Sequence, residues 1–120
     1  MKKLILLSFL AFSFNLTAQE VACEDLLEYV VDEGYNKASV NSYSLINSEW
    51  LRSVKAYDLQ GKTFVVAEIK KNNSYLAKKY IFCGVPSSNW NAFYSGLYDL
   101  RTPYGERFHK YIMDYECNCY

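Results

Sequence analysis

The four cysteines are the residues of this 120-residue chain most able to form covalent bonds or to bind metal. They are Cys23, Cys83, Cys117 and Cys119. A bridge between Cys117 and Cys119 would close a ring too small for relaxed disulfide geometry. We therefore expect Cys23 and Cys83 to pair separately with the two tail cysteines, in an order that the sequence leaves open. Each bridge would contribute about 3 to 5 kcal/mol in the chain-entropy model. A four-thiolate zinc site is the less favoured alternative, because the chain has no C-x-x-C pair.

The single histidine, His109, is the one candidate general base of imidazole type. Glu106 lies three residues earlier, on the same face of a predicted helix. A hydrolase built on these two residues is the weakest of the functions considered, since no serine or cysteine lies in a nucleophile motif. The sequence also has no glycine-rich phosphate loop and no ligand spacing for a metal. We therefore predict no catalytic residue, no metal site and no cofactor, and favour a non-enzymatic role.

A binding role has more support, because lysines gather near the ends of the predicted strands. A possible binding patch contains Lys62, Lys70, Lys71, Tyr75, Lys78 and Lys79. Lysines beside an aromatic ring can grip phosphates and stack bases, so a nucleic acid or another polyanion is one candidate ligand. The favoured interpretation is plainer: solvated lysines at a hairpin that discourage edge-to-edge strand pairing.

The first 18 residues differ from the rest of the chain. Lys2 and Lys3 precede a short apolar run, and small and polar residues end the segment at Ala18, as is typical of a secretory signal peptide. We predict cleavage after Ala18 and a secreted or periplasmic protein, in which disulfides are expected. Lipid attachment at Cys23 is a minor alternative. Removing Lys2 and Lys3 from the 13 basic residues leaves 11 against 13 acidic ones, so the mature chain is not a globally basic nucleic-acid binder.

The mature chain predicts an α+β domain. Apolar residues at helical spacing indicate a first helix from Cys23 to Asp32 that ends at Gly34. Its polar face is an acidic stripe, interpreted as solvated, with a partner site as the alternative: Glu24, Asp25, Glu28, Asp32 and Glu33. The connector at 35–48 contains turn-like residues and one short candidate edge strand at 43–46.

Three strands are predicted next, over 50–59, 63–70 and 75–85, joined by turns at 60–62 and 71–74. They form an antiparallel meander. In the third strand, alternation places Tyr80, Phe82 and Gly84 on one face, and Ile81, Cys83 and Val85 on the other. A strand apolar on both faces is covered on both sides or central in its sheet.

Two helices follow the meander. Pro86 ends the third strand, Ser87 or Ser88 caps the first helix, and its apolar stripe is Trp90, Phe93, Tyr94 and Leu97. We interpret this stripe as core, with a ligand groove as the alternative. Thr102 caps a second helix with Pro103 in its first position. The apolar residues of the second helix continue from Tyr104 to Tyr115.

Several motifs in this order resemble the KTSC domain, a short domain named after the C-terminal extension of some lysyl-tRNA synthetases. The resemblance runs from about Trp50 to Tyr115 and rests on Val54 to Asp58, Tyr80-Ile81-Phe82, Gly84-Val85-Pro86, Gly105-Glu106-Arg107-Phe108 and Ile112. The family's Tyr-x-Tyr is Tyr80-Ile81-Phe82 here, and its Ser-x-Gly is Pro103-Tyr104-Gly105. The family-motif residues carried over are Tyr80, Phe82, Gly84, Val85, Pro86, Gly105 and Phe108.

The resemblance implies little about activity, because RNA binding is suggested for the family only through its association with a synthetase. The predicted organisation is a signal peptide at 1–18, a helix and connector at 19–47, a KTSC-like domain at 48–115 and a cysteine-bearing tail at 116–120. The favoured function is an exported interaction module stapled by disulfides. Its partner is not identified by the sequence, and a protein partner is favoured over RNA.

Overall fold

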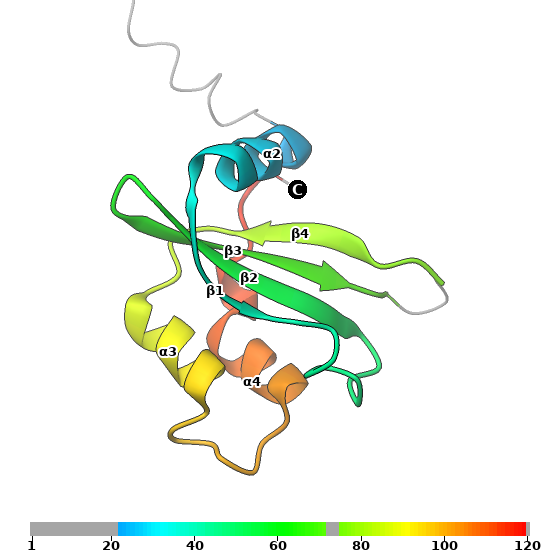
Figure 1. Cartoon of the computed structure of the whole chain (residues 1–120). Helices are drawn as coiled ribbons and strands as arrows, with labels where there is room; N and C mark the ends of the chain where they lie inside the picture. Colours follow the sequence, from blue (N-terminus) through cyan, green and yellow to red (C-terminus); the bar gives the residue numbers. More distant parts are fainter. Residues whose placement is uncertain (1–21, 72–74, 120) are drawn as a thin grey trace, which may run out of the picture.

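The computed structural model describes residues 22–71 and 75–119, and the predicted signal peptide lies outside them. One four-stranded antiparallel sheet, in the order β1-β2-β3-β4, has helix α2 on one face and helices α3 and α4 on the other (Figure 1). The predicted α+β class is therefore confirmed. The elements are α2 (Cys23–Glu33), β1 (Tyr35–Val40), β2 (Leu51–Leu59), β3 (Lys62–Ile69), β4 (Lys78–Phe82), α3 (Ser87–Ser95), α4 (Tyr104–Tyr111) and the 3-10 turn η2 (Met113–Tyr115).

The β2–β3 hairpin is the centre of the sheet and follows the predicted pattern closely. Its strands pair from Leu51 with Ile69 to Leu59 with Lys62. Gln60 and Gly61 form the turn with φ of 53° and 77°, which is the pair of left-handed conformations that a tight hairpin turn requires. Because both faces of β3 are covered by helices, its residues are apolar on both sides.

The edge strand β1 lies earlier in the chain than predicted. The structure places it at Tyr35–Val40, whereas the segment 42–47, including the predicted strand at 43–46, is a turn. The turn-like Asn36 is accommodated by a bulge, since the pairing with β2 shifts between Asn36 and Ala38. Leu45 is buried from this turn, so its apolar character reflects core packing and not a strand.

Strand β4 is shorter than the predicted third strand and lies at an edge of the sheet, not at its centre. The C-terminal tail runs along its outer side: the N–H of Cys83 donates to the carbonyl of Tyr115 at 2.8 Å, and the N–H of Cys117 donates to that of Ile81 at 3.2 Å. The tail therefore covers a sheet edge that would otherwise be open to pairing. Gly84 adopts φ of 63°, which breaks the strand alternation. As a result Val85 joins the same core as Phe82, contrary to the predicted faces.

Helices α3 and α4 begin without the side-chain caps that the sequence predicts. Pro86 is the N-cap of α3 and Pro103 the N-cap of α4, so Ser87, Ser88 and Thr102 do not cap. A proline suits this place because its fixed φ of about −65° fits the start of a helix. The helices pack on the sheet through Trp90, Phe93, Phe108 and Ile112, which are all buried.

One charged side chain, Arg107, is buried between these two helices. Its Nε donates to the carbonyl of Phe93 at 2.9 Å and its Nη1 to the carbonyl of Thr102 at 2.7 Å. The guanidinium also lies over the ring of Tyr104, 4.2 Å from its centroid. A Cβ at Gly96 would stand 2.9 Å from this guanidinium, and Gly96 has φ of 66°. Glycine is thus required there both by the helix end and by Arg107.

Helix α2 packs on the opposite face of the sheet over a small cluster that includes Val30, Tyr57, Val66 and Ile81. Its predicted stop, Gly34, is a close contact point: a Cβ there would lie 2.6 Å from the carbonyl oxygen of Val30 and 3.1 Å from the Cβ of Tyr57. The residues of the acidic stripe are all exposed, as predicted for a solvated face. Burial beneath α2 raises the pKa of the Tyr57 hydroxyl.

Candidate interaction surfaces

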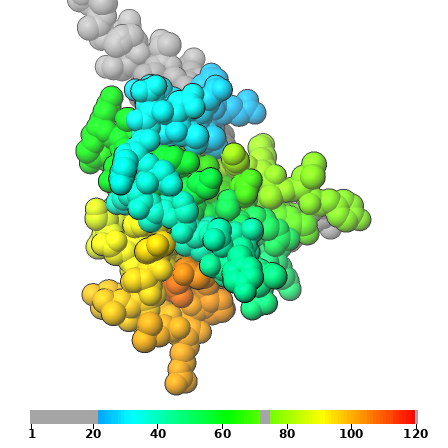
Figure 2. Space-filling model, in the orientation of Figure 1, coloured from blue at the N-terminus to red at the C-terminus, as the bar shows by residue number. Residues whose placement is uncertain are grey.

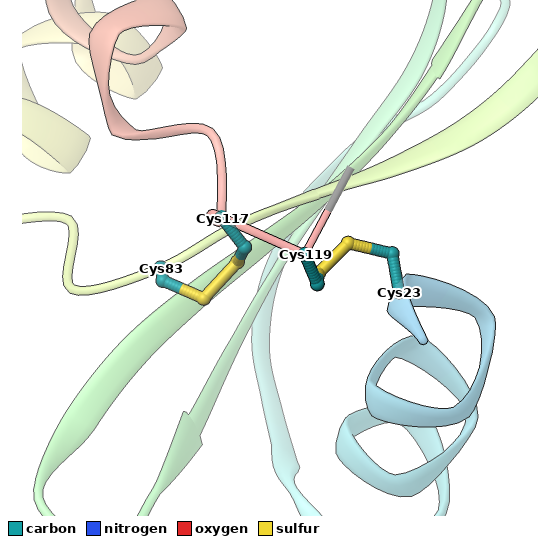
Figure 3. The surroundings of a disulfide bond; sticks show 4 residues. All are labelled: Cys23, Cys83, Cys117 and Cys119. Carbon is teal, nitrogen blue, oxygen red and sulfur yellow. A yellow bond between two sulfur atoms is a disulfide. The ribbon is translucent and has the colours of Figure 1, made fainter. Parts of the chain in front are cut away.

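The cysteines form two disulfides that bind the tail to both neighbouring elements (Figure 3). Cys23 at the start of α2 bonds to Cys119, and Cys83 after β4 bonds to Cys117. The pairing order left open by the sequence is thereby settled. No thiol remains among the four, so the four-thiolate zinc alternative is wrong and the Cys23 sulfur is not available for lipid. Within residues 22–71 and 75–119, no other group of side chains could hold a metal ion.

His109 and Glu106 are both exposed on α4. The His109 ring packs against the Trp50 indole, with centroids 4.8 Å apart, and in the described chain no hydrogen bond or ion pair joins His109 to Glu106. Glu106 instead lines a surface hollow of about 460 Å³ between the start of α4 and the turn before β2. Trp50 forms part of this hollow and lies against Gly105, where a Cβ would come 3.2 Å from the indole nitrogen.

The lysines of the predicted binding patch do not form one group. Lys62 begins β3 beside the β2–β3 turn, whereas Lys70 and Lys71 follow the other end of that strand. Lys62 and Lys70 are eight residues apart along this extended strand, a separation of roughly 26 Å. Lys62 is therefore excluded from the patch. The residues that the structure brings together at the end of the β3–β4 hairpin are Lys70, Lys71, Tyr75, Lys78 and Lys79.

The geometry of this hairpin end is set by the pairing of β3 with β4. Lys78 lies opposite Ile69, and Lys79 lies opposite Glu68, whose carboxylate accepts a hydrogen bond from Ser53 at 2.9 Å. The ammonium groups of Lys71 and Lys78 lie over the ring of Tyr80, at 4.9 and 5.8 Å from its centroid. Two cations thus share one aromatic ring on the face of the sheet that carries α3 and α4.

A second surface, which sequence reasoning missed, lies at the end of α3 and in the segment leading to α4. Tyr94 and Leu97 were predicted to continue the buried stripe of α3, but both are exposed. Leu97 lies beyond the helix, which ends at Ser95 before Gly96 turns the chain away, whereas Tyr94 is still helical and stacks on the Trp90 ring with one face open to solvent. Tyr98 and Leu100 are each 78% exposed in the same segment. The apolar run after Gly96 is the signal that could have identified this surface. We call Tyr94, Leu97, Tyr98 and Leu100 the α3–α4 surface.

Polar contacts hold this segment in place. The carboxylate of Asp99 accepts hydrogen bonds from the Tyr111 hydroxyl at 2.5 Å and from the Lys110 ammonium at 3.1 Å. These hydrogen bonds, from Tyr111 and then Lys110, lower the pKa of the Asp99 carboxyl. The hydrogen bond to Asp99 in turn raises the pKa of Lys110. The contacts of Asp99, with those of Arg107 to Thr102, fix the backbone that presents the apolar side chains.

The residues that carry the family resemblance either pack in the core or set the conformation and spacing of the backbone. Phe82, Val85 and Phe108 are buried in the core beneath α3 and α4, and Tyr80 packs against it. Gly84 provides the positive φ after β4, Pro86 starts α3, and Gly105 makes room for Trp50. None of these residues lies in an arrangement that suggests catalysis.

Comparisons with protein-family models, with curated proteins and with solved structures each find no match to the chain. Among the described helices, none is long and apolar enough to cross a membrane. The chain is a small α+β protein with two disulfides, and its candidate surfaces are the α3–α4 surface and the end of the β3–β4 hairpin.

Proposed function

We propose that this chain is an exported interaction module of the KTSC type that binds a protein partner through the α3–α4 surface. One observation carries the proposal: the apolar side chains of that segment are exposed, while hydrogen bonds hold its backbone in place. Four large apolar side chains face solvent on a backbone anchored by Asp99 and Arg107. Large apolar side chains exposed close together in the chain are often found at protein–protein contacts. Tyrosine and leucine on a fixed backbone also lose little conformational entropy on binding.

Export is supported by the signal-like sequence at 1–18 and by the use of every cysteine in a disulfide. The KTSC assignment is supported by the order of its motifs along the fold: two hairpin strands, the strand carrying Tyr80 and Phe82, the Gly-Val-Pro turn, and two helices. The bond of Cys23 to Cys119 then joins the segment before the domain to the segment after it.

The proposed function can be tested by capturing partners with the oxidised mature protein from culture supernatant and envelope fractions. The key variant is Leu97→Ser/Leu100→Ser, since both side chains are exposed and the fold does not depend on them. We expect a protein that binds the unaltered chain saturably and is not retained by this variant. Tyr43→Ser is the matched control, because Tyr43 is an exposed aromatic residue in the turn before β2 and lies outside the α3–α4 surface.

Equal capture by the Leu97→Ser/Leu100→Ser variant would show that the α3–α4 surface is not the binding surface. The export step has its own measurement. The intact mass of the mature protein should correspond to a chain beginning at Gln19 that lacks four hydrogen atoms because of the two bridges.

A further inference from the structure

The end of the β3–β4 hairpin projects beyond the helices that cover the rest of the sheet (Figures 1 and 2). Next to it in the chain, Tyr75 is 98% and Leu76 is 80% exposed. Two adjacent apolar side chains that are exposed to this degree can gain free energy when another surface covers them. Their position favours contact with a surface outside the molecule over contact with the domain's own core.

Lysines lie close to these two residues in the chain and on both faces of the β3–β4 hairpin. Lys71 and Lys78 lie on the face of Tyr80, and Lys79, the next residue of β4, points to the opposite face of the sheet. Two carboxylates are near: Glu68, opposite Lys79, and Glu24, which borders a small hollow shared with Lys78 and Lys79. With Lys70, four lysines face two carboxylates, so this end of the hairpin is positively charged although the mature chain as a whole is slightly acidic.

From this arrangement we propose that the end of the β3–β4 hairpin is a peripheral binding site for an anionic lipid surface. Tyr75 and Leu76 enter the headgroup region, and Lys70, Lys71, Lys78 and Lys79 contact the lipid phosphates. Tyrosine is well suited to the membrane interface, where its ring is buried and its hydroxyl remains hydrated. Lysine side chains flanking an apolar tip can extend toward the headgroups.

A lipid surface fits this arrangement better than a nucleic acid does. A binder of single strands typically has a groove in which aromatic rings and cations line one face. Here the cations lie on both faces of a hairpin, and one of the two highly exposed side chains beside them is Leu76, which has no ring on which a base could stack. The proposal is independent of the α3–α4 surface, which lies at the end of α3 and contains no residue of the hairpin.

The test is co-sedimentation of the oxidised mature protein with vesicles of phosphatidylcholine, prepared with and without phosphatidylglycerol. We expect binding only to the anionic vesicles, and weaker binding as salt is raised. Lys71→Gln/Lys78→Gln should weaken binding about thirtyfold, since each lysine near an anionic surface contributes about fivefold. Lys62→Gln is the matched control, because Lys62 is an exposed lysine at the opposite end of the same strand. It should bind like the unaltered chain.

Insertion is tested separately from charge attraction. Tyr75→Ser/Leu76→Ser should weaken binding about tenfold through the lost apolar burial. A Tyr75→Trp variant should show fluorescence quenching by brominated lipids. Failure to bind anionic vesicles, or equal effects of the Lys62 and Lys71/Lys78 substitutions, would overturn the proposal. It would also be overturned by tighter binding to single-stranded RNA that competes with the vesicles, which would assign the hairpin to nucleic acid.

Discussion

The two faces of the sheet are stabilised by different means. Among residues 22–71 and 75–119, the core under α3 and α4 has fourteen buried residues, and Phe108 makes edge-to-face contacts with Phe82 and Phe93. The core on the α2 face has six buried residues, of which two are cysteines. Helix α2 itself buries only Cys23 and Val30. Leu26 and Leu27 are half-buried against the same cluster, so packing of this helix is limited in area and the Cys23–Cys119 disulfide adds a covalent link. The disulfides therefore lie on the face of the sheet that has fewer buried residues.

The largest expected loss of stability comes from removing a disulfide, which tests how far the α2 face depends on covalent bonds. Replacing the α2 bridge, in Cys23→Ser/Cys119→Ser, frees a loop whose ends are 96 residues apart. The chain-entropy model gives a loss of at most about 4.7 kcal/mol in the free energy of unfolding for this loop and about 3.8 for the 34-residue loop of Cys83–Cys117. Denaturant unfolding measures both losses. Hydrogen exchange should show that the amides of α2 lose protection first, and unchanged protection of α2 would contradict the comparison.

Phe108→Ala tests how much apolar packing stabilises the face of the sheet under α3 and α4. This side chain is fully buried and contacts Phe82 and Phe93, with centroids 5.2 and 5.7 Å away. Its removal should lower the free energy of unfolding by about 3 to 5 kcal/mol. Phe64→Ala, a half-buried phenylalanine on the α2 face, is the matched control and should cost clearly less. Equal losses in denaturant unfolding would mean that the two faces contribute alike.

Arg107→Met separates the polar from the apolar part of the α3–α4 packing. The substitution keeps much of the side-chain volume but leaves the carbonyls of Phe93 and Thr102 without their donor. We expect a loss of about 2 to 6 kcal/mol in the free energy of unfolding, measured by thermal or denaturant unfolding, since each of the two unsatisfied carbonyls costs about 1 to 3 kcal/mol. Arg101→Met, at an exposed position, should change stability by less than about 0.5 kcal/mol. A neutral Arg107→Met would show that apolar packing alone fixes these helices.

The smallest effect concerns Asp99. Its hydrogen bonds lower the pKa in the folded state below the usual 3.8, so the unfolded chain binds the proton more tightly. The stabilisation by Asp99 is therefore complete above pH 3.8 and is lost as the pH falls through the lowered value. The thermal midpoint of Asp99→Asn should lie below that of the unaltered chain near neutral pH, and the two should converge in acid. A constant difference at all pH values would indicate that the carboxylate charge is not involved.

The sequence predicted the elements whose signals are local. Gln60-Gly61 indicated the hairpin turn, the spacing of Trp90 and Phe93 indicated a buried helix face, and Gly34 indicated the end of α2. It failed where an element depends on a distant partner. Asn36 and Lys37 read as a turn, but β1 forms because β2 offers an unpaired edge there. The predicted binding patch included Lys62, although the predicted turns at 60–62 and 71–74 already separate Lys62 from Lys71 by the length of one strand, as the structure places them.

The sequence by itself determined that two disulfides anchor a cysteine tail, because four cysteines in a chain with a signal-like start have few acceptable pairings. Only the tertiary structure decided their order. The backbone hydrogen bonds of the tail to Ile81 and Cys83 place Cys117 beside Cys83, and Cys119, two residues farther along, then reaches Cys23 at the start of α2. Likewise, the composition shows that aromatic residues are abundant, but only the tertiary structure decided which of them are buried in the core and which are exposed to solvent. Both outcomes depend on contacts between residues far apart in the chain, which no local pattern encodes.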